Sequence, residues 1–176
     1  MKSGVFAVAG QIGSGKSSVA EFLGALTGAA VTSFSRVLVD LAISNKLTPS
    51  RDVLQQLGAE TAEKAPEMLC HKVLEQANWT GNDLVIDGLR HRTIAEKLRT
   101  FVAPKRLWIV YVEANVGLRR ARVMAETGID ALPRWDAQPS ELFLPELRRC
   151  ADVVLTNEDS LDQLRFRVSY WISDQE

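Results

Sequence analysis

The residues best suited to chemistry lie near the N-terminus, in the segment G-Q-I-G-S-G-K-S at positions 10–17. Glycines let backbone N–H groups curl around an anion, and a helix that begins beside them adds the positive end of its dipole. Lys16 contributes a full positive charge, and the hydroxyl of Ser17 can bind Mg²⁺. The pattern G-x-x-x-x-G-K-S therefore predicts a loop that binds the phosphates of a nucleotide. The residues expected to bind them are Gly10, Gln11, Ile12, Gly13, Ser14, Gly15, Lys16, Ser17 and Ser18.

A glycine-rich turn between a strand and a helix is the alternative interpretation of this segment. It is disfavoured because a turn gives no reason for a lysine and a serine at these two positions. The loop by itself leaves the reaction open among a GTPase, a motor, a kinase and a nucleotide sensor. A GTPase is disfavoured because the sequence has no N-K-x-D run for guanine, and a chain of 176 residues is small for a motor.

Short apolar runs alternate with amphipathic segments along the chain, which is typical of parallel strands joined by helical crossovers. The runs predicted as strands are 4–9, 29–32, 83–87, 105–112 and 152–156. The segments predicted as helices are 16–27, 36–44, 49–58, 61–76, 93–100, 117–126 and one that follows Ser160. Thr48 is expected to cap the helix that starts at Pro49, and Gly58 to end it. A T-x-x-E capping box at Thr93 and Glu96 is expected to start the helix 93–100, and Ser160 with Gln163 to start the last one. This pattern predicts a single three-layer α/β domain over residues 1–176, with a five-stranded parallel sheet and helices on both faces. We expect 34–80 to be a helical insert that binds the substrate, and 127–140 to be a loop that forms a short lid.

Charged residues follow the third and second predicted strands, at the sheet edge where ligands bind in open parallel sheets. Asp87 lies at the tip of the third strand and is suited to hold Mg²⁺, while Arg90 in the next loop is suited to bind an anion. A helix-capping aspartate and a surface salt bridge are the respective alternatives. Arg36, with Ser35 beside it, opens the helix after the second strand and predicts a site for a second phosphate. An ion pair with Asp40, four residues later, is the competing explanation.

A cluster of arginines follows the fourth predicted strand, in the segment V-G-L-R-R-A-R. Arg119 and Arg122 are three residues apart and share one helix face, where they could neutralise a phosphoryl group during its transfer. Arg134, in the predicted lid, could close over the same site, and its neighbour Trp135 could stack on a base. A solvated helix face or a nucleic-acid contact is the alternative for this cluster.

The totals of the sequence favour a small-molecule partner over a nucleic acid or a membrane. The net charge is −1, so the chain as a whole does not attract nucleic acid or anionic lipid, and any anion site must be local. The two cysteines and two histidines have no metal-binding spacing, which predicts free thiols in a reducing compartment. No run of about 18 apolar residues is present, so we expect a cytoplasmic location. The oligomeric state stays open.

Taken together, these segments resemble those of the nucleoside-monophosphate kinase branch of P-loop proteins. The resemblance depends on the glycine loop, Arg36 after the second strand, D-G-L-R at 87–90, R-R-A-R at 119–122 and A-D-V-V-L-T-N at 151–157. Within this branch the chain is most similar to deoxynucleoside monophosphate kinases, to dephospho-coenzyme-A kinases and to small archaeal-type kinases with an I-D-G-x-R strand end. The resemblance implies a P-loop NTPase fold.

The resemblance also implies an ATP- and Mg²⁺-dependent phosphotransferase that adds the γ-phosphate of ATP to a (deoxy)nucleoside monophosphate. In that family pattern, the glycine loop wraps the ATP phosphates, and Asn157 lies in a loop near the donor adenine. Arg36 and Arg90 would hold the phosphate of the acceptor, and Arg119 and Arg122 would bracket the transferred group. The residues expected to act in catalysis are Lys16, Asp87, Arg119, Arg122 and Arg134, with Ser17 and Asp87 at the metal.

The sequence departs from the family pattern in ways that leave two alternatives open. Arg134 is the one arginine of the predicted lid, which motivates a nucleotide-binding sensor with little turnover. The other alternative is a dephospho-coenzyme-A kinase or another small-molecule kinase. In dephospho-coenzyme-A kinases an aspartate shortly after the second strand activates a hydroxyl acceptor, whereas here that place is S-F-S-R and Asp40 is the nearest carboxylate. Because a phosphate acceptor needs no base, this difference favours a monophosphate.

Overall fold

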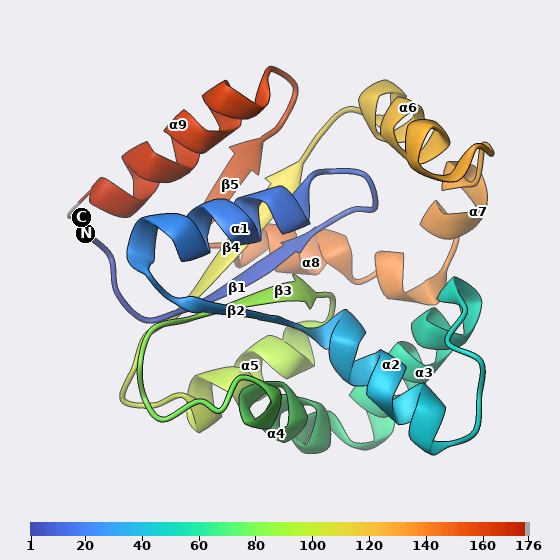
Figure 1. The fold of residues 1–176 in the computed structure, drawn as a ribbon, viewed down its shortest axis with the longest axis horizontal. Helices are drawn as coiled ribbons and strands as arrows, with labels where there is room; N and C mark the ends of the chain where they lie inside the picture. Colours follow the sequence, from blue (N-terminus) through green and yellow to red (C-terminus); the bar gives the residue numbers. More distant parts are fainter. Residues whose placement is uncertain (175–176) are drawn as a thin grey trace.

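The computed structural model describes residues 1–174, and a five-stranded parallel β-sheet lies at its centre (Figure 1). The strands are β1 (Val5–Gly10), β2 (Ala30–Ser33), β3 (Leu84–Leu89), β4 (Leu107–Glu113) and β5 (Val153–Thr156). Their order across the sheet is β2-β3-β1-β4-β5, and each neighbouring pair is parallel. The predicted α/β fold is therefore confirmed.

The central strand β1 is buried along its whole length. Val5, Ala7 and Ala9 join the hydrophobic cluster on one face of the sheet, whereas Phe6 and Val8 join the cluster on the other face. Successive side chains of a strand point to opposite faces. A continuous apolar run such as V-F-A-V-A therefore requires helices on both sides of the sheet.

One face of the sheet is covered by α1 (Lys16–Thr27) and α9 (Leu161–Ser173), which lie toward the viewer in Figure 1. Leu23 of α1 and Leu164 of α9 are fully buried, and both belong to the cluster that contains Phe6 of β1. Packing of one stripe on each helix against the sheet fixes where α1 begins, and hence where the glycine loop must turn.

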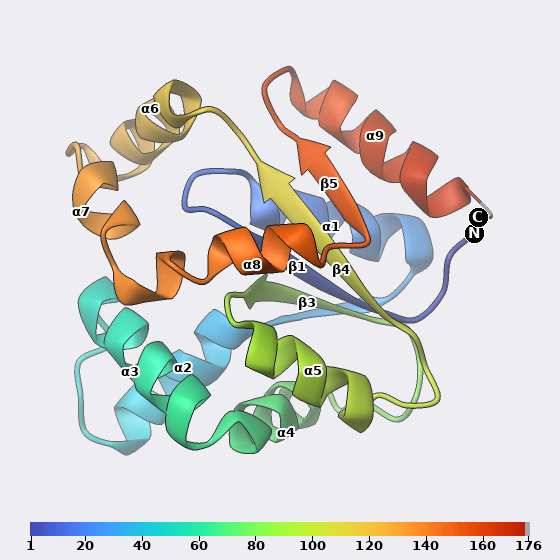
Figure 2. The same cartoon turned by 180° about the vertical axis from the view of Figure 1, so that it is seen from behind.

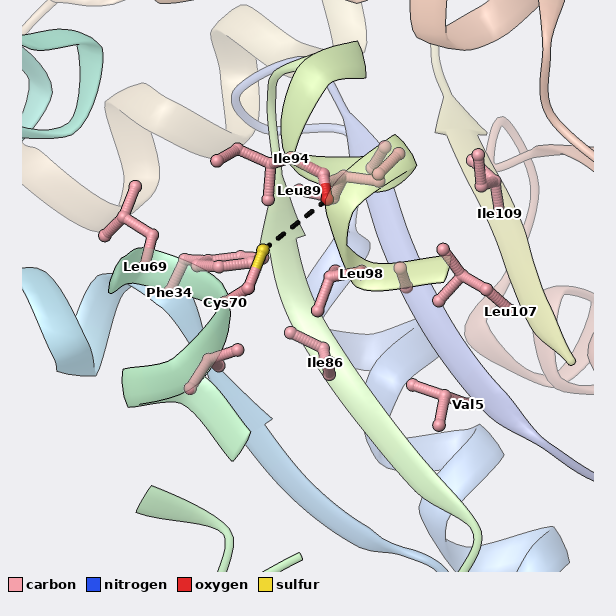
Figure 3. Packing of buried hydrophobic residues seen from close by; sticks show 14 of the residues in the cluster. Val5, Phe34, Leu69, Cys70, Ile86, Leu89, Ile94, Leu98, Leu107 and Ile109 are labelled. Atoms are coloured by element: carbon pink, nitrogen blue, oxygen red, sulfur yellow. Dashed lines mark hydrogen bonds between the residues drawn. The ribbon is translucent and has the colours of Figure 1, made fainter. Parts of the chain in front are cut away.

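The opposite face is covered by α4 (Pro66–Gln76), α5 (Arg92–Phe101) and α8 (Leu144–Arg149); α5 and α8 lie in front of the sheet in Figure 2. The larger hydrophobic cluster forms on this face, and Figure 3 shows part of it around Cys70. The thiol of Cys70 lies 3.7 Å from the backbone oxygen of Ile94, and burial raises its pKa to about 12. Both cysteines are free, and Cys70 fills the core as a small apolar side chain.

Helices α2 (Phe34–Ser44) and α3 (Arg51–Lys64) extend beyond the carboxyl end of β2, as Figures 1 and 2 show. The predicted stop at Gly58 is wrong, because α3 continues through it. A Cβ atom at Gly58 would lie 3.0 Å from the side chain of Leu38, so the glycine lets α2 and α3 approach closely. The packing of α2 on α3 at Gly58 offsets the low helix propensity of glycine, so α3 continues through this residue.

The caps and breaks around α3 and α4 also differ from the sequence prediction. Ser50, not Thr48, caps α3, since its hydroxyl accepts a hydrogen bond from the backbone N–H of Val53 at 3.4 Å. The predicted helix 61–76 is split, because Pro66 begins α4 instead of lying inside a helix. Proline has no N–H to donate, and at the first turn of a helix that N–H would have no partner anyway.

Residues 127–140 were predicted as a loop, but they form short helices. After α6 (Val116–Thr127) come α7 (Leu132–Asp136) and the 3₁₀ turn η1 (Pro139–Glu141), and then α8. Each of the three segments after α6 has a proline in its first turn. Prolines that suggest a loop in the sequence therefore start helices here.

Of the two predicted capping boxes, one is confirmed and one is wrong. The side chain of Ser160 accepts a hydrogen bond from the backbone N–H of Gln163 at 3.3 Å, which caps α9 as expected. By contrast, α5 begins at Arg92 behind His91, and no side chain caps it. Thr93 therefore lies inside the first turn and cannot cap it.

The helices of the domain are short compared with a bilayer. A membrane-spanning helix needs about 20 apolar residues. Among residues 1–174 the longest helix is α3, with 14 residues, and none of the helices could cross a membrane.

The position of α8, which the sequence did not predict, can be tested with a pair of leucines. Leu147 is fully buried against the sheet, whereas Leu142 is 72% exposed. We expect Leu147→Ala to lower the free energy of unfolding by about 2–5 kcal/mol, since it leaves a cavity in the core. Leu142→Ala should change it by less than about 0.5 kcal/mol. Urea unfolding of both variants measures the difference, and equal effects would contradict this placement of α8.

Candidate active site

The glycine loop connects β1 to α1 at the carboxyl edge of the sheet. In the sheet, β1 lies between β3 and β4, so the chain leaves β1 at the point where the strand order reverses. Open parallel sheets bind ligands in the crevice at this point. The loop, the end of β3 and the residues after β4 are thereby brought to one edge.

The conformation of the loop depends on its glycines at two positions. Gly13 has φ +75° and Gly15 has φ +94°, in the left-handed region that other residues avoid. A Cβ atom on Gly15 would lie 2.2 Å from the side-chain nitrogen of Asn157. The loop is closed by a hydrogen bond from the backbone N–H of Ser14 to the oxygen of Gln11, at 3.2 Å.

Side chains from other elements hold the carbonyl groups of the loop from outside. Arg119 donates to the oxygen of Ile12 at 3.2 Å, and Arg122 donates to that of Gly13 at 3.2 Å. Asn157 donates to the oxygen of Ser14 at 2.8 Å, and Arg122 also reaches the oxygen of Asn157 at 3.0 Å. A trans peptide points its N–H opposite to its C=O. Fixing these oxygens therefore turns N–H groups of the glycine loop toward the opposite side, as an anion site requires.

Lys16, the first residue of α1, lies among other cations. Its pKa is lowered to about 7 by burial, then by the charge of Arg90 and, more weakly, by those of Arg51 and Arg119. The carboxylate of Asp87 acts in the opposite direction but does not compensate. The electrostatic potential around the Lys16 ammonium is therefore positive, which is the condition for binding a polyanion.

A hydroxyl and a carboxylate suited to Mg²⁺ lie next to the loop. The hydroxyl of Ser17 donates to Oδ2 of Asp87 at 2.8 Å, and Oδ1 of Asp87 is buried with no hydrogen-bond partner among residues 1–174. Mg²⁺ prefers oxygen ligands and takes one or two from the protein when phosphates supply others. These two side chains fit such an ion. Among residues 1–174, no group of three His, Cys, Asp or Glu side chains forms an all-protein metal site.

A pocket of about 290 Å³ opens beside the loop, between α2, α3 and the end of β3. Its apolar lining comes from Phe34, Leu38, Leu54, Leu69 and Ile94. Its polar lining comes from Ser35, Arg51, Gln55, Arg90, His91 and Ser140. Three of the apolar residues belong to the core and are labelled in Figure 3, so the pocket is continuous with a rigid interior.

Two arginines bring positive charge to this pocket. Arg90 forms an ion pair with Glu141 of η1, and burial followed by the charge of Arg51 lowers its pKa to about 10. The guanidinium of Arg51 lies 3.9 Å from the ring centre of Trp135. Each arginine is thereby oriented by a neighbour while its charge acts on the other and on Lys16. The pocket therefore has a second cluster of cations beside the one at the glycine loop, and its charge is suited to bind an anion.

The predicted acceptor residues fall into two groups. Ser35 and Arg90 line the pocket, whereas Arg36 is exposed and is absent from its lining. The backbone N–H of Arg36 donates to the side chain of Ser33, which caps α2. The carboxylate of Asp40 accepts a hydrogen bond from Gln76 of α4, at 3.4 Å. The structure thus brings Arg90, but not Arg36, to the pocket.

The arginines expected over the transferred group are bound to carboxylates in this structure. Arg119 is buried and pairs with both oxygens of Asp136 in α7, at 2.9 and 2.7 Å. Arg134 of α7 is exposed and pairs with Asp52 of α3. Trp135 packs in the small hydrophobic cluster beneath the loop, so its ring is not free to stack on a base as the sequence suggested. These contacts join α6, α7 and α3 beside the glycine loop and the pocket.

Five residues of the candidate site were missed in the sequence: Arg51, Gln55, His91, Ser140 and Glu141. Arg51 and Gln55 are four apart and so share a face of α3, but nothing local shows which face meets the glycine loop. Ser140 is the last residue of the segment 127–140 that was interpreted as a loop, and Glu141 follows it directly. The one local signal for Arg51 and Gln55 is Ser50, because a serine cap at this position fixes the start of α3 at Arg51.

The titration of Lys16 gives a pH dependence for nucleotide binding. A bound polyanion raises the pKa of Lys16, so binding is strongest when Lys16 is protonated and weakens as the pH rises above about 7. We expect the affinity for ATP, measured by calorimetry in EDTA between pH 7.5 and 8.5, to fall by about tenfold. Lys16→Arg, which stays charged, should bind with no such slope. A flat profile in the unsubstituted protein would contradict the lowered pKa.

A matched pair of arginines on α6 tests the bracing of the loop. Arg122 bonds to two backbone oxygens, whereas its neighbour Arg120 pairs with Asp130 on the surface. We expect Arg122→Ala to weaken ATP binding about tenfold, since one charged hydrogen bond contributes about 1.5–3 kcal/mol. Arg120→Ala should leave the dissociation constant within about twofold. Equal effects of the two substitutions would show that the loop does not depend on this brace.

Comparison with known proteins agrees with this architecture. Residues 7–132 match the AAA domain family. A UPF0200 protein from Aeropyrum pernix is 29% identical over 167 residues, which cover 92% of this chain and 88% of that protein. Among solved structures, a sugar kinase from Janibacter sp. superposes with a TM-score of 0.64 at 17% identity, covering 98% of this chain and 95% of that one. A gluconokinase from Sinorhizobium meliloti gives 0.55 at 20% identity, covering 97% and 91%.

The two solved structures show a shared P-loop kinase-like fold, and the family match adds common ancestry of the sequence. That match begins in β1, contains the glycine loop and the end of β3, and extends through α6 to Leu132. It covers most of the chain, including the glycine loop, Arg51 and Arg90, and we conclude that the protein belongs to the AAA domain family.

Proposed function

We propose that this protein is an ATP- and Mg²⁺-dependent phosphotransferase whose acceptor is a (deoxy)nucleoside monophosphate. The observation that carries the proposal is the pair of adjacent cation clusters, each suited to bind an anion. Lys16 and the glycine loop form one, Arg90 and Arg51 form the other, and the charges of the two sites act on each other. A site for two phosphorylated molecules in contact is what phosphoryl transfer between nucleotides needs.

The residues of the first site would hold the donor. The N–H groups of the loop and the Lys16 ammonium would bind the β- and γ-phosphates of ATP, and Ser17 with Asp87 would hold Mg²⁺. The ion supplies neutralisation of the charge on the phosphates as the γ-phosphoryl group moves. Asn157 lies against Ser14, so the loop that contains it would border the nucleoside of ATP.

The second site would hold the acceptor with its phosphate toward Lys16. An oxygen of that phosphate would attack the γ-phosphorus in line, and the bond from phosphorus to the ADP oxygen would break. Arg90 and Arg51 would neutralise the acceptor and align it, which reduces the repulsion between two anions. Arg119 and Arg134 would reach the transferred group after exchange of their carboxylate partners, as parts of a lid.

The chemistry of the pocket supports a phosphate acceptor over a hydroxyl. Its lining contains no carboxylate, and Asp40, the candidate base in the sequence, contacts α4 instead. An anionic phosphate oxygen is already a nucleophile and needs no base. One observation favours a second candidate, a hydroxyl-bearing small molecule such as a sugar. His91 lines the pocket, and burial followed by the charge of Arg90 lowers its pKa, so its neutral ring could accept a proton.

The proposal is tested by incubating the purified chain with Mg²⁺-ATP and a panel of acceptors. The panel contains ribo- and deoxynucleoside monophosphates, dephospho-coenzyme A and gluconate, and the formation of ADP is followed. We expect ADP release that depends on a nucleoside monophosphate, and a fall in kcat/KM of about 10²–10³-fold in Lys16→Ala, which removes a cation from the phosphates. Lys64→Ala, on an exposed lysine at the end of α3, is the matched control and should keep full activity.

The same panel separates the alternatives. Turnover with dephospho-coenzyme A or gluconate that is lost in His91→Ala would favour a hydroxyl acceptor. ATP binding without any acceptor-dependent turnover would support a nucleotide sensor and exclude the proposed reaction.

A further inference from the structure

The pocket contains a side-chain amide without a protein partner. Both the nitrogen and the oxygen of the Gln55 amide are buried and have no hydrogen-bond partner among the described residues. A buried donor or acceptor that stays unpaired costs about 1–3 kcal/mol. Native proteins pair nearly all such groups, and the exceptions call for an explanation such as a ligand. Gln55 lines the pocket, so a bound molecule can reach it.

The amide presents one donor and one acceptor side by side. A ligand that satisfies both must offer an acceptor and a donor on neighbouring atoms of a planar group. The Watson–Crick edges of nucleobases have this arrangement, and glutamine pairs with bases through two hydrogen bonds in known complexes. The apolar part of the pocket lining includes Leu54, Leu38 and Phe34, which would pack against the faces of a base.

Helix α3 places this amide at a suitable distance from the anion site. Arg51 and Gln55 are four residues apart, so they lie on one helix face with a rise of about 6 Å between them. Gly58 and Ala59 continue the same face and also line the pocket, where their small size leaves room beside the amide. A nucleotide lying along α3 would have its phosphate at Arg51 and Arg90 and its base at Gln55.

We propose that Gln55 determines the specificity of the acceptor site and that its amide binds the hydrogen-bonding edge of a nucleobase. This inference rests on the proposed function and names the group that would distinguish a nucleotide from other phosphorylated molecules. Gln56, which is exposed and donates to Glu60, takes no part in the pocket and serves as a matched control.

The test measures binding, separately from turnover, by calorimetry with nucleoside monophosphates and with ribose 5-phosphate, which has the same phosphate but no base. In the unsubstituted protein we expect the preferred nucleotide to bind about 100-fold more tightly than ribose 5-phosphate. Gln55→Leu should reduce that preference by about 10–100-fold, because it removes both hydrogen bonds. Its affinity for ribose 5-phosphate should stay within about threefold, and Gln56→Leu should change neither affinity.

Two further measurements exclude a merely structural role. Gln55→Leu removes two unpaired buried atoms, so its melting temperature should be equal to or above that of the unsubstituted protein. Gln55→Glu keeps the shape but offers acceptors alone, and it should shift the preference toward guanine, which presents neighbouring donors. A clear fall in melting temperature for Gln55→Leu, or an unchanged order of bases for Gln55→Glu, would overturn the inference.

Failure of this inference can be distinguished from failure of the proposed function. If monophosphates are phosphorylated but Gln55→Leu keeps the base preference, the inference is wrong and the function stands. If monophosphates bind with a preference that depends on Gln55 but are not phosphorylated, the inference stands and the reaction is wrong. If no monophosphate binds more tightly than ribose 5-phosphate, the inference is overturned.

Discussion

The glycine loop keeps its shape because side chains far away in the sequence hold its carbonyl oxygens. Arg119, Arg122 and Asn157 donate to three consecutive residues of the loop, from α6 and from the end of β5. The loop thus depends on the order of the strands, since β4 and β5 must lie beside β1 for these side chains to reach it. The rest of the site depends on this constraint, because a loop with free carbonyl groups would turn oxygens toward an anion instead of N–H groups.

The same elements concentrate positive charge that the protein alone does not balance. Burial lowers the pKa of both Lys16 and Arg90, and neighbouring cations lower it further: Arg90 and Arg51 act on Lys16, and Arg51 acts on Arg90. The carboxylate of Asp87 stabilises the charged form of Lys16, but burial and the neighbouring cations together outweigh it and lower the pKa of Lys16. The chain as a whole carries a net charge of −1, so the basic region is local. A local positive potential suits a small polyanion and gives no reason for binding a long nucleic acid.

Helix α3 connects the two halves of the proposed reaction. Its first residue, Arg51, packs on Trp135 of α7 and contributes to the potential at Lys16, while Gln55 lies one turn further along in the pocket. Asp52 on the same helix binds Arg134, which ties α3 to the segment expected to act as a lid. An acceptor that contacts α3 would therefore affect the contacts of α7 with the glycine loop. This coupling gives a physical route by which filling one site could prepare the other.

Local patterns of the sequence were enough to predict the loop, the parallel sheet and the pair of Ser17 with Asp87. Each depends on spacing within a few residues or on the rule that parallel strands end at one edge of the sheet. Local patterns did not predict which face of a helix would line the pocket. Arg36 and Arg51 both lie in the first turn of a helix, and the tertiary packing of α2 on α3 decides that Arg51 lines the pocket while Arg36 is exposed. The short helices after α6 were missed because proline has the same local signature at the start of a helix as in a loop.

The sequence by itself therefore determined that a phosphate-binding loop stands at the edge of a parallel α/β sheet, because backbone conformation and strand burial are encoded locally. The tertiary structure decided which cations share the site, which carboxylates hold Arg119 and Arg134, and that the pocket-lining Gln55 amide has no hydrogen-bond partner among residues 1–174. These outcomes depend on distances between elements that are separated by tens of residues. Packing of whole helices sets such distances, and no short pattern in the chain records them.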